Sequence, residues 1–200
     1  MTKTKKGFTL LELLIVIGIL SILSTTVVLV INPAQLLKKA RDSQRISDLN
    51  TLKTAIAYYI TEAPTPDIGT VTPTYSEVAD VICMTRAADA SVLLTTGGAG
   101  WIPINFGGLT GGSPIGSLPK DPNPTIATAS PGRYYVYLVG SATDYTFELA
   151  ANMESTYYTT SGDGDVETGD GGSISTLYEV GTAMAVLTTT TAACYVGSGV

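Results

Sequence analysis

The sequence predicts an α+β protein in which a long N-terminal helix carries a head built on an antiparallel sheet. Three observations lead to this prediction. An almost purely apolar run covers residues 8–31, an amphipathic pattern covers residues 32–63, and residues 64–200 are rich in glycine, threonine, serine and tyrosine. Residues 1–7 form a short basic leader. We expect the amphipathic half of the helix to pack against the sheet.

The apolar run is long enough to cross a bilayer. It contains a single charged residue, Glu12. A helical residue rises about 1.5 Å, so residues 8–31 cover a hydrocarbon core of roughly 30 Å. We therefore expect this segment to span a membrane as a helix before any assembly.

Glu12 needs a partner in such a helix. A carboxylate near the start of a lipid-exposed helix costs on the order of a few kcal/mol unless it is neutralised. If the chain is cut between Gly7 and Phe8, the new amino terminus lies about one helical turn before Glu12. The amine and the carboxylate then neutralise each other within one chain or between neighbouring chains. Between neighbours, the pair would set the axial position of each subunit.

The residues from Gly7 to Glu12, together with the basic leader and the apolar run, closely resemble the prepilin leader and N-terminal helix of type IV pilins and pseudopilins. The resemblance covers residues 1–63. In that family a prepilin peptidase cuts after the glycine that matches Gly7 and methylates the amine of the residue that matches Phe8. The glutamate that matches Glu12 governs assembly.

The resemblance implies a structural function. It predicts a homo-oligomer, the helical filament of a type IV pilus, which serves adhesion, motility or DNA uptake. The implied partners are the prepilin peptidase, membrane lipid before assembly, and an inner-membrane assembly platform with its ATPase motor. The precursor would lie in the inner membrane and the product on the cell surface. The alternatives are a pseudopilin of a secretion or competence system, which forms a short piston, and a membrane-anchored binding domain or enzyme.

Composition argues against several other functions. The chain has a net charge of −6, and from residue 64 onward three basic residues oppose thirteen acidic ones. We therefore expect no direct nucleic-acid binding by the head. The chain contains no histidine, which rules out Ser-His and Cys-His catalysis within it. We expect no enzyme and no cofactor, although a carboxylate pair such as Glu148 and Glu154 leaves acid–base chemistry open.

The two helical segments meet at Asn32 and Pro33. Asparagine is a favoured N-cap and proline a favoured first helical residue, so we expect a break at this point. Apolar residues then recur at threes and fours up to Glu62. The charged side chains between them are expected either to form a solvated face or to contact other subunits; they are Lys39, Asp42, Arg45, Asp48 and Lys53.

The head is expected to contain a hairpin and further strands. Residues 133–139 and 145–152 alternate tyrosines with aliphatic residues and are joined by a turn, so they predict a hairpin with one face on the helix and one face outside. Residues 177–180 and 184–191 are also typical of strands. Residues 75–94 favour a short helix.

The two cysteines, Cys83 and Cys194, are expected to form a disulfide in an extracytoplasmic domain. A metal pair is less favoured because no histidine can join it. The bridge would close a loop that includes most of the head and would act as a structural staple.

Residues 161–172 gather acidic side chains among glycines. Calcium takes six to eight oxygen ligands, which flexible Asp/Gly loops can supply. Some major pseudopilins bind calcium in a C-terminal loop, so the resemblance makes this segment a candidate site; the ligands would be Asp163, Asp165, Glu167 and Asp170. The EF-hand spacing is not met, and a solvated loop is the alternative.

Overall fold

A computed structural model describes residues 7–71, 74–75, 94–123 and 135–187. The chain divides into two compact units, Met1–Leu37 and Lys38–Val200. The first unit contains α1 (Leu10–Ile31), and the second contains most of α2 (Pro33–Glu62) and the sheet. Each unit is described separately below.

The α1 helix begins and ends with local signals. Thr9 is its N-cap, and Asn32 closes it in the left-handed conformation, with φ 42°. The large apolar side chains described on α1 are exposed, from 48% at Val16 to 82% at Leu10. No helix in the described part of the chain meets both the length and the apolarity needed to cross a membrane. The membrane span predicted for residues 8–31 is therefore not confirmed.

The α2 helix starts directly after Asn32, where the sequence predicts a break. The backbone amides of Gln35 and Leu36 donate to the Asn32 carbonyl oxygen at 3.0 and 3.3 Å. The helix ends before Pro64, whose ring disfavours continuation. Its buried apolar residues recur at threes and fours; they are Leu49, Leu52, Ala55, Ile56 and Tyr59.

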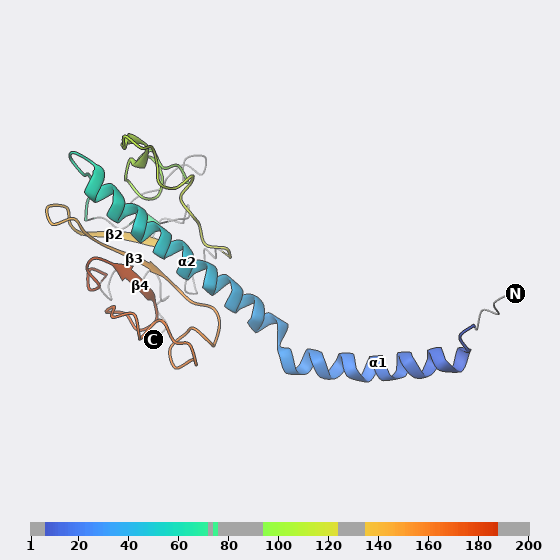
Figure 1. Ribbon diagram of the computed structural model, residues 1–200. Coiled ribbons are helices and arrows are strands. Elements are labelled where there is room, and N and C mark those ends of the chain that lie inside the picture. Colours follow the sequence, from blue (N-terminus) through green and yellow to red (C-terminus); the bar gives the residue numbers. More distant parts are fainter. Residues whose placement is uncertain (1–6, 72–73, 76–93, 124–134, 188–200) are drawn as a thin grey trace, which may run out of the picture. The chain divides into compact units, whose positions relative to one another are not determined.

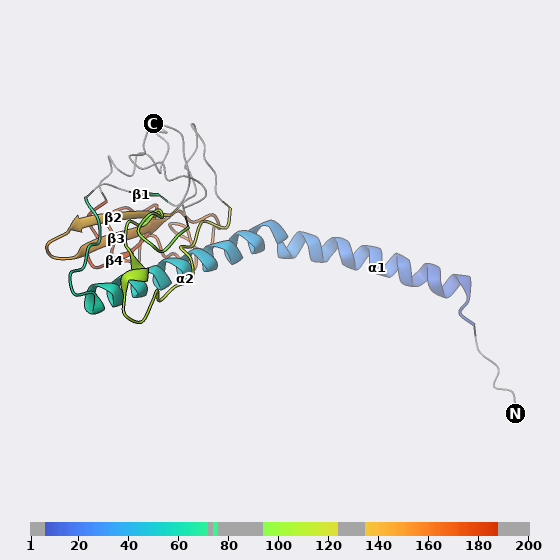
Figure 2. The ribbon, with the colours of Figure 1, turned by 90° about the horizontal axis from the view of Figure 1, so that it is seen from above.

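Four antiparallel strands form one sheet in the order β1-β2-β3-β4; Figure 1 labels β2 to β4, and Figure 2 also labels β1. Their bounds are β1 Thr74–Tyr75, β2 Val136–Ser141, β3 Thr146–Ala151 and β4 Tyr178–Gly181. The predicted hairpin is confirmed as β2 and β3, and the strand predicted over residues 177–180 as β4. The α+β class is confirmed as well. The short helix expected within residues 75–94 lies almost wholly outside the described residues.

The main core lies between α2 and one face of the sheet, as the two views show (Figures 1 and 2). Leu52 and Ile56 of α2 and Tyr137 and Phe147 of the sheet are fully or almost fully buried in it. Trp101 comes from the loop region, and its indole N–H donates to the Pro119 carbonyl oxygen at 3.0 Å. The core therefore joins the helix to the sheet, as the alternating pattern predicts.

The opposite face of the sheet is also covered, and this corrects the prediction of one solvated face. Val136, Leu138 and Ala150 of that face form a second apolar cluster with residues from beyond β3, namely Ile174, Leu177 and Leu187. The strand predicted over residues 184–191 is wrong for its described part, residues 184–187, which form no strand. Those residues instead bring apolar side chains onto the sheet.

Candidate assembly segment and ionic network

The first turn of α1 provides hydrogen bonds to its own charged residue. The Thr9 backbone N–H donates to Glu12 Oε2 at 2.9 Å, and the Thr9 hydroxyl lies 2.8 Å from the same oxygen. In return the Glu12 backbone N–H donates to Thr9 Oγ1 at 3.2 Å. This reciprocal capping box satisfies two helix-end donors and the carboxylate together. The Glu12 carboxylate is therefore hydrogen-bonded without the help of a distant residue of its own chain.

Three described hydroxyl groups of α1 are satisfied in the same local way. Ser21 donates to the Gly18 carbonyl oxygen at 2.8 Å, and Ser24 donates to that of Leu20 at 2.7 Å. Thr25 donates to the Ser21 carbonyl oxygen at 2.9 Å. Hydroxyls bonded to preceding carbonyls leave no donor for an outside partner.

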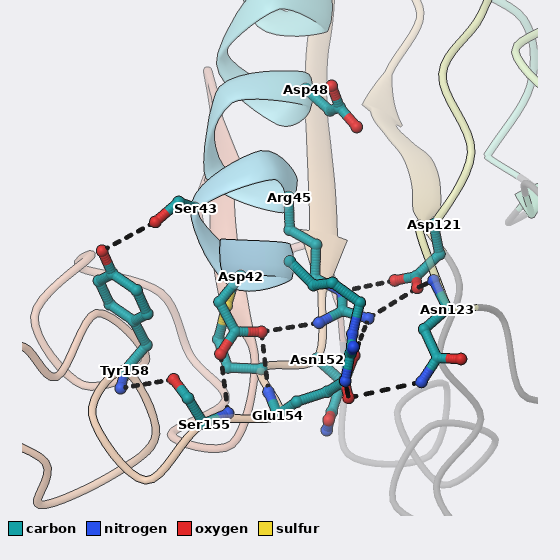
Figure 3. A network of polar contacts seen from close by, with 12 residues as sticks. Asp42, Ser43, Arg45, Asp48, Asp121, Asn123, Asn152, Glu154, Ser155 and Tyr158 are labelled. Carbon is teal, nitrogen blue, oxygen red and sulfur yellow. Dashed lines mark hydrogen bonds and ion pairs between the residues drawn. The ribbon is translucent and has the colours of Figure 1, made fainter. Parts of the chain in front are cut away.

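A second polar centre lies in the head, around Arg45 of α2 (Figure 3). The Arg45 side chain is fully buried. Its Nε and Nη2 donate to the two oxygens of Asp121 at 2.6 and 2.7 Å. Its Nη1 lies 2.7 Å from Asp42 Oδ1, and Nη2 lies 2.6 Å from Glu154 Oε1. One guanidinium therefore holds three carboxylates from three parts of the chain.

The surrounding groups complete the ionic network, which we define as Arg41, Asp42, Arg45, Asp121 and Glu154. Arg41 donates to both Glu154 oxygens at 3.0 and 2.7 Å. Asp42 accepts the backbone amides of Glu154 and Ser155 at 2.9 and 2.7 Å. Charge-assisted and bidentate bonds of this kind are the strong ones. The network therefore joins α2 to the loop before β2 and to the segment after β3.

The burial of Arg45 alone would lower its pKa. The hydrogen bonds that Arg45 donates to Asp121 and Glu154, and the negative charges of these carboxylates, act in the opposite direction and prevail, so the pKa of Arg45 lies above its ordinary value. The guanidinium stays charged at every physiological pH. Since four hydrogen bonds join the guanidinium to three carboxylates, the arrangement locks the fold of the head.

The expectation that Asp42 and Arg45 belong to a solvated or intersubunit face is wrong. Both are fully buried inside their own head. The partners, Asp121 and Glu154, lie 76 and 109 residues further along the chain, so a local charge pattern does not reveal them. A usable signal was present, because Arg45 falls on the same three-and-four spacing as Leu49 and the apolar residues after it.

Residues 2–28 match the family model of the prokaryotic N-terminal methylation motif. This chain carries a prepilin-type N-terminus. The motif marks type IV pilins and pseudopilins, which are structural proteins rather than enzymes. No curated protein and no solved structure matches the chain.

The predicted processing position lies at the edge of the described prepilin-type segment. Gly7 and Phe8 precede the first residue of α1, and Phe8 is 88% exposed. A Cβ atom placed on Gly7 would meet nothing within 4 Å. The peptide bond between them therefore lies in non-helical chain before α1.

The predicted disulfide between Cys83 and Cys194 lies outside the described residues. The carboxylates Glu148 and Glu154, considered as an acid–base pair, serve separate sites. Glu154 belongs to the ionic network, whereas Glu148 accepts backbone amides from residues 186 and 187 on the other face of the sheet. The structure brings no catalytic pair together from these two residues.

The predicted calcium ligands do not converge. Among the described residues, no three acidic, histidine or cysteine side chains gather as a metal site would require.

Asp165 accepts the amides of Ser161, Glu167 and Thr168, and Asp170 accepts those of Gly172 and Glu179. Glu167 turns inward, to the amides of Met153 and Thr160. Asp163, the fourth predicted ligand, likewise belongs to no such group among the described residues. The carboxylates of Asp165, Glu167 and Asp170 thus accept hydrogen bonds from backbone amides and stabilise the loop.

Proposed function

We propose that this chain is the precursor of a type IV pilus subunit, which polymerises through α1 into a filament on the cell surface. After cleavage between Gly7 and Phe8, the α1 helices of many copies would form the apolar centre of the filament. The heads would lie outside. The assembled fibre would serve in adhesion, motility or DNA uptake.

The observation that carries the proposal is the exposure of α1. Its described apolar side chains are about half or more exposed, so lipid or other copies of the helix must cover them. The described hydroxyls, those of Ser21, Ser24 and Thr25, are bonded to its own backbone, and its one charge accepts hydrogen bonds from Thr9. A helix of this kind can leave lipid for a bundle of identical helices without exposing an unpaired donor.

The free amine created at Phe8 would compete with Thr9 for Glu12. An amine bears a full charge, so a charge-assisted pair with a neighbour's Glu12 is stronger than the neutral bonds from Thr9. In the proposed filament, cleavage would therefore create the group that fixes the axial position of each subunit. The prepilin peptidase, the assembly platform and its ATPase motor are the partners that this sequence of events requires.

The ionic network supports the proposal from the side of the head. A filament subunit is pulled through its helix, so the helix must be tied firmly to the domain it carries. Arg45 and Arg41 of α2 hold carboxylates from two distant segments, and Leu49 and Leu52 lie buried one to two turns further along α2. Separation of α2 from the head would leave these charges without partners.

Intact mass spectrometry on material sheared from the cell surface, compared with the membrane fraction, tests this function. The proposal predicts that the sheared fraction contains this chain beginning at a methylated Phe8. A processed chain found wholly in membranes would favour a pseudopilin instead. A chain that still carries residues 1–7 in both fractions would overturn the proposal.

A further inference from the structure

The face of the sheet opposite α2 contains two buried carboxyl groups. Glu148 of β3 and Glu179 of β4 are both fully buried. Gly181 lies opposite Glu148 and Ala150 lies opposite Glu179, so the two glutamates are diagonal neighbours on one face. Around them lies the second apolar cluster, which includes Leu138 and Leu187. Long side chains at diagonal positions reach each other.

Each carboxyl group is satisfied through one oxygen only. Glu148 Oε2 accepts the backbone amides of Val186 and Leu187, both at 2.8 Å. Glu179 Oε2 accepts the amide of Ile174 at 2.8 Å. The two Oε1 atoms are buried, and no described group of the chain supplies either with a donor. Two buried acceptor oxygens therefore lack a hydrogen-bond donor among the described residues.

Two ionised carboxylates are not stable in this position. Like charges side by side in an apolar site disfavour each other, and neither has an ion-pair partner among the described residues. The other titratable group that faces them is Asp170, in the loop before β4, and it is also an acid. A proton on one carboxyl converts it into a donor for the other. Both orphan oxygens are then satisfied at once.

We propose that Glu148 and Glu179 share one proton and form an acid-stabilised clamp that holds two segments, residues 170–174 and 186–187, against the sheet. Glu148 accepts hydrogen bonds from the two backbone amides of residues 186–187, and Glu179 accepts one from the backbone amide of Ile174. Asp170 adds to the clamp by accepting the backbone amides of Gly172 and Glu179 at 2.7 and 2.6 Å. Gly172 lies directly against the Glu179 carboxyl, where there is no room for a side chain.

The titration of Glu179 agrees with this geometry. Burial, followed by the hydrogen bond with Glu148, raises the pKa of Glu179 from 4.5 to about 9. The folded chain therefore keeps a proton that the unfolded chain loses, so the clamp's stabilising effect is complete below the unfolded pKa and decreases as pH rises toward 9. Above that pH Glu179 loses its proton, and the two segments are expected to loosen. The head is thus held more tightly in acidic than in alkaline surroundings.

The decisive variant is Glu179→Gln, which keeps an acceptor for Ile174 and supplies a permanent donor for Glu148. The measurement is the unfolding equilibrium of the full chain in detergent micelles, followed by near-ultraviolet circular dichroism at several pH values. Relative to Glu179→Gln, the unfolding constant of the native chain is expected to rise up to about tenfold per pH unit between pH 5 and 8. Asp144→Asn, at an exposed turn, is the matched control and should show a constant ratio. A constant ratio for Glu179→Gln as well would overturn the proposal.

Infrared spectroscopy of the unmodified full chain tests the same proton without any variant. A carbonyl stretch of a protonated carboxyl group is expected at pH 7 and should disappear above about pH 9. If that band is absent at pH 7, the proton is not there and the proposal fails. A melting temperature that rises with added calcium chloride, and no longer does so in Glu179→Gln, would likewise overturn it by placing a cation between the two oxygens.

Discussion

Glu12, inside the apolar run of α1, and Arg45, on the buried face of α2, both carry a charge, yet their charges are satisfied in different ways. Glu12 is satisfied by Thr9, three residues before it, and its helix exposes its apolar side chains. Arg45 binds Asp42, three residues before it, but also Asp121 and Glu154, far along the chain, and its helix buries apolar side chains in the head.

This difference separates the roles of the two helices. Because α1 satisfies its polar groups locally, it can exchange one apolar environment for another without breaking a long-range contact. The head depends on α2, because the ionic network and the main core both include it. We therefore expect changes in α2 to act on the stability of the head, and changes in α1 to act on assembly.

The largest effect on the head is expected from Arg45→Ala. Removal of the guanidinium leaves three carboxylates without their central cation, and the loss of one partner from a buried ion pair costs about 3–5 kcal/mol. Urea unfolding of the full chain in micelles, at pH 7, measures it. Lys53→Ala, at a half-exposed position of the same helix, should change the free energy of unfolding by less than about 0.5 kcal/mol. Equal effects of the two variants would show that the network does not lock the head.

Alanine substitution of one leucine in each helix compares the two helices directly. Leu49 is fully buried, so Leu49→Ala is expected to lower the free energy of unfolding of the head by about 2–5 kcal/mol. Leu14 of α1 is 60% exposed, so Leu14→Ala should leave that free energy within about 0.5 kcal/mol of the native value. The same urea titration serves both variants. A large loss for Leu14→Ala would mean that α1 contributes to the stability of the head.

A smaller effect is expected from Tyr135→Phe. The Tyr135 hydroxyl donates to Asp48 Oδ2 at 2.8 Å, and its loss leaves a half-buried carboxylate with one donor fewer, at a cost of about 1–2 kcal/mol at pH 7. Burial raises the pKa of Asp48, although the bond from Tyr135 lowers it. The difference between variant and native chain should shrink as pH falls through the pKa of Asp48, because a protonated carboxyl needs no donor. A difference that is constant from pH 7 to pH 3 would contradict this assignment.

The smallest effect is expected from Thr9→Ala, which removes the N-cap of α1. Loss of such a cap costs about 1 kcal/mol, and this should appear as roughly fivefold faster hydrogen exchange of the amides in the first turn of α1. Ser24→Ala, further along the same helix, serves as the control and should leave those amides unchanged. Unaltered exchange in Thr9→Ala would show that the capping box does not hold the helix end.

Sequence patterns predict most of the local structure of this protein. The two helices, the β2–β3 hairpin and β4 follow from periodicity, from Asn32 and Pro33, and from the turn between the tyrosine-rich strands. The prepilin-type motif follows from residues 7–12 and the run after them. These features share one property, since the residues that specify each of them are close in the chain.

The parts that the sequence does not predict depend on distant residues. Arg45 looks solvated until Asp121 and Glu154 are placed beside it. The second face of the sheet looks exposed until Ile174, Leu177 and Leu187 cover it. The acidic loop resembles a calcium site because its composition does not show that Asp165 and Asp170 bind backbone amides of their own surroundings.

The central claim is that α1 assembles the filament and that Glu12 directs this assembly. The most direct test is the amount of filament sheared from cells that produce Glu12→Ala, with the membrane fraction analysed for cleavage after Gly7 and with Ser24→Ala as the matched control in the same helix. The account predicts a cleaved Glu12→Ala chain that stays in the membrane fraction, and normal filaments from Ser24→Ala. Normal filaments from Glu12→Ala would contradict it.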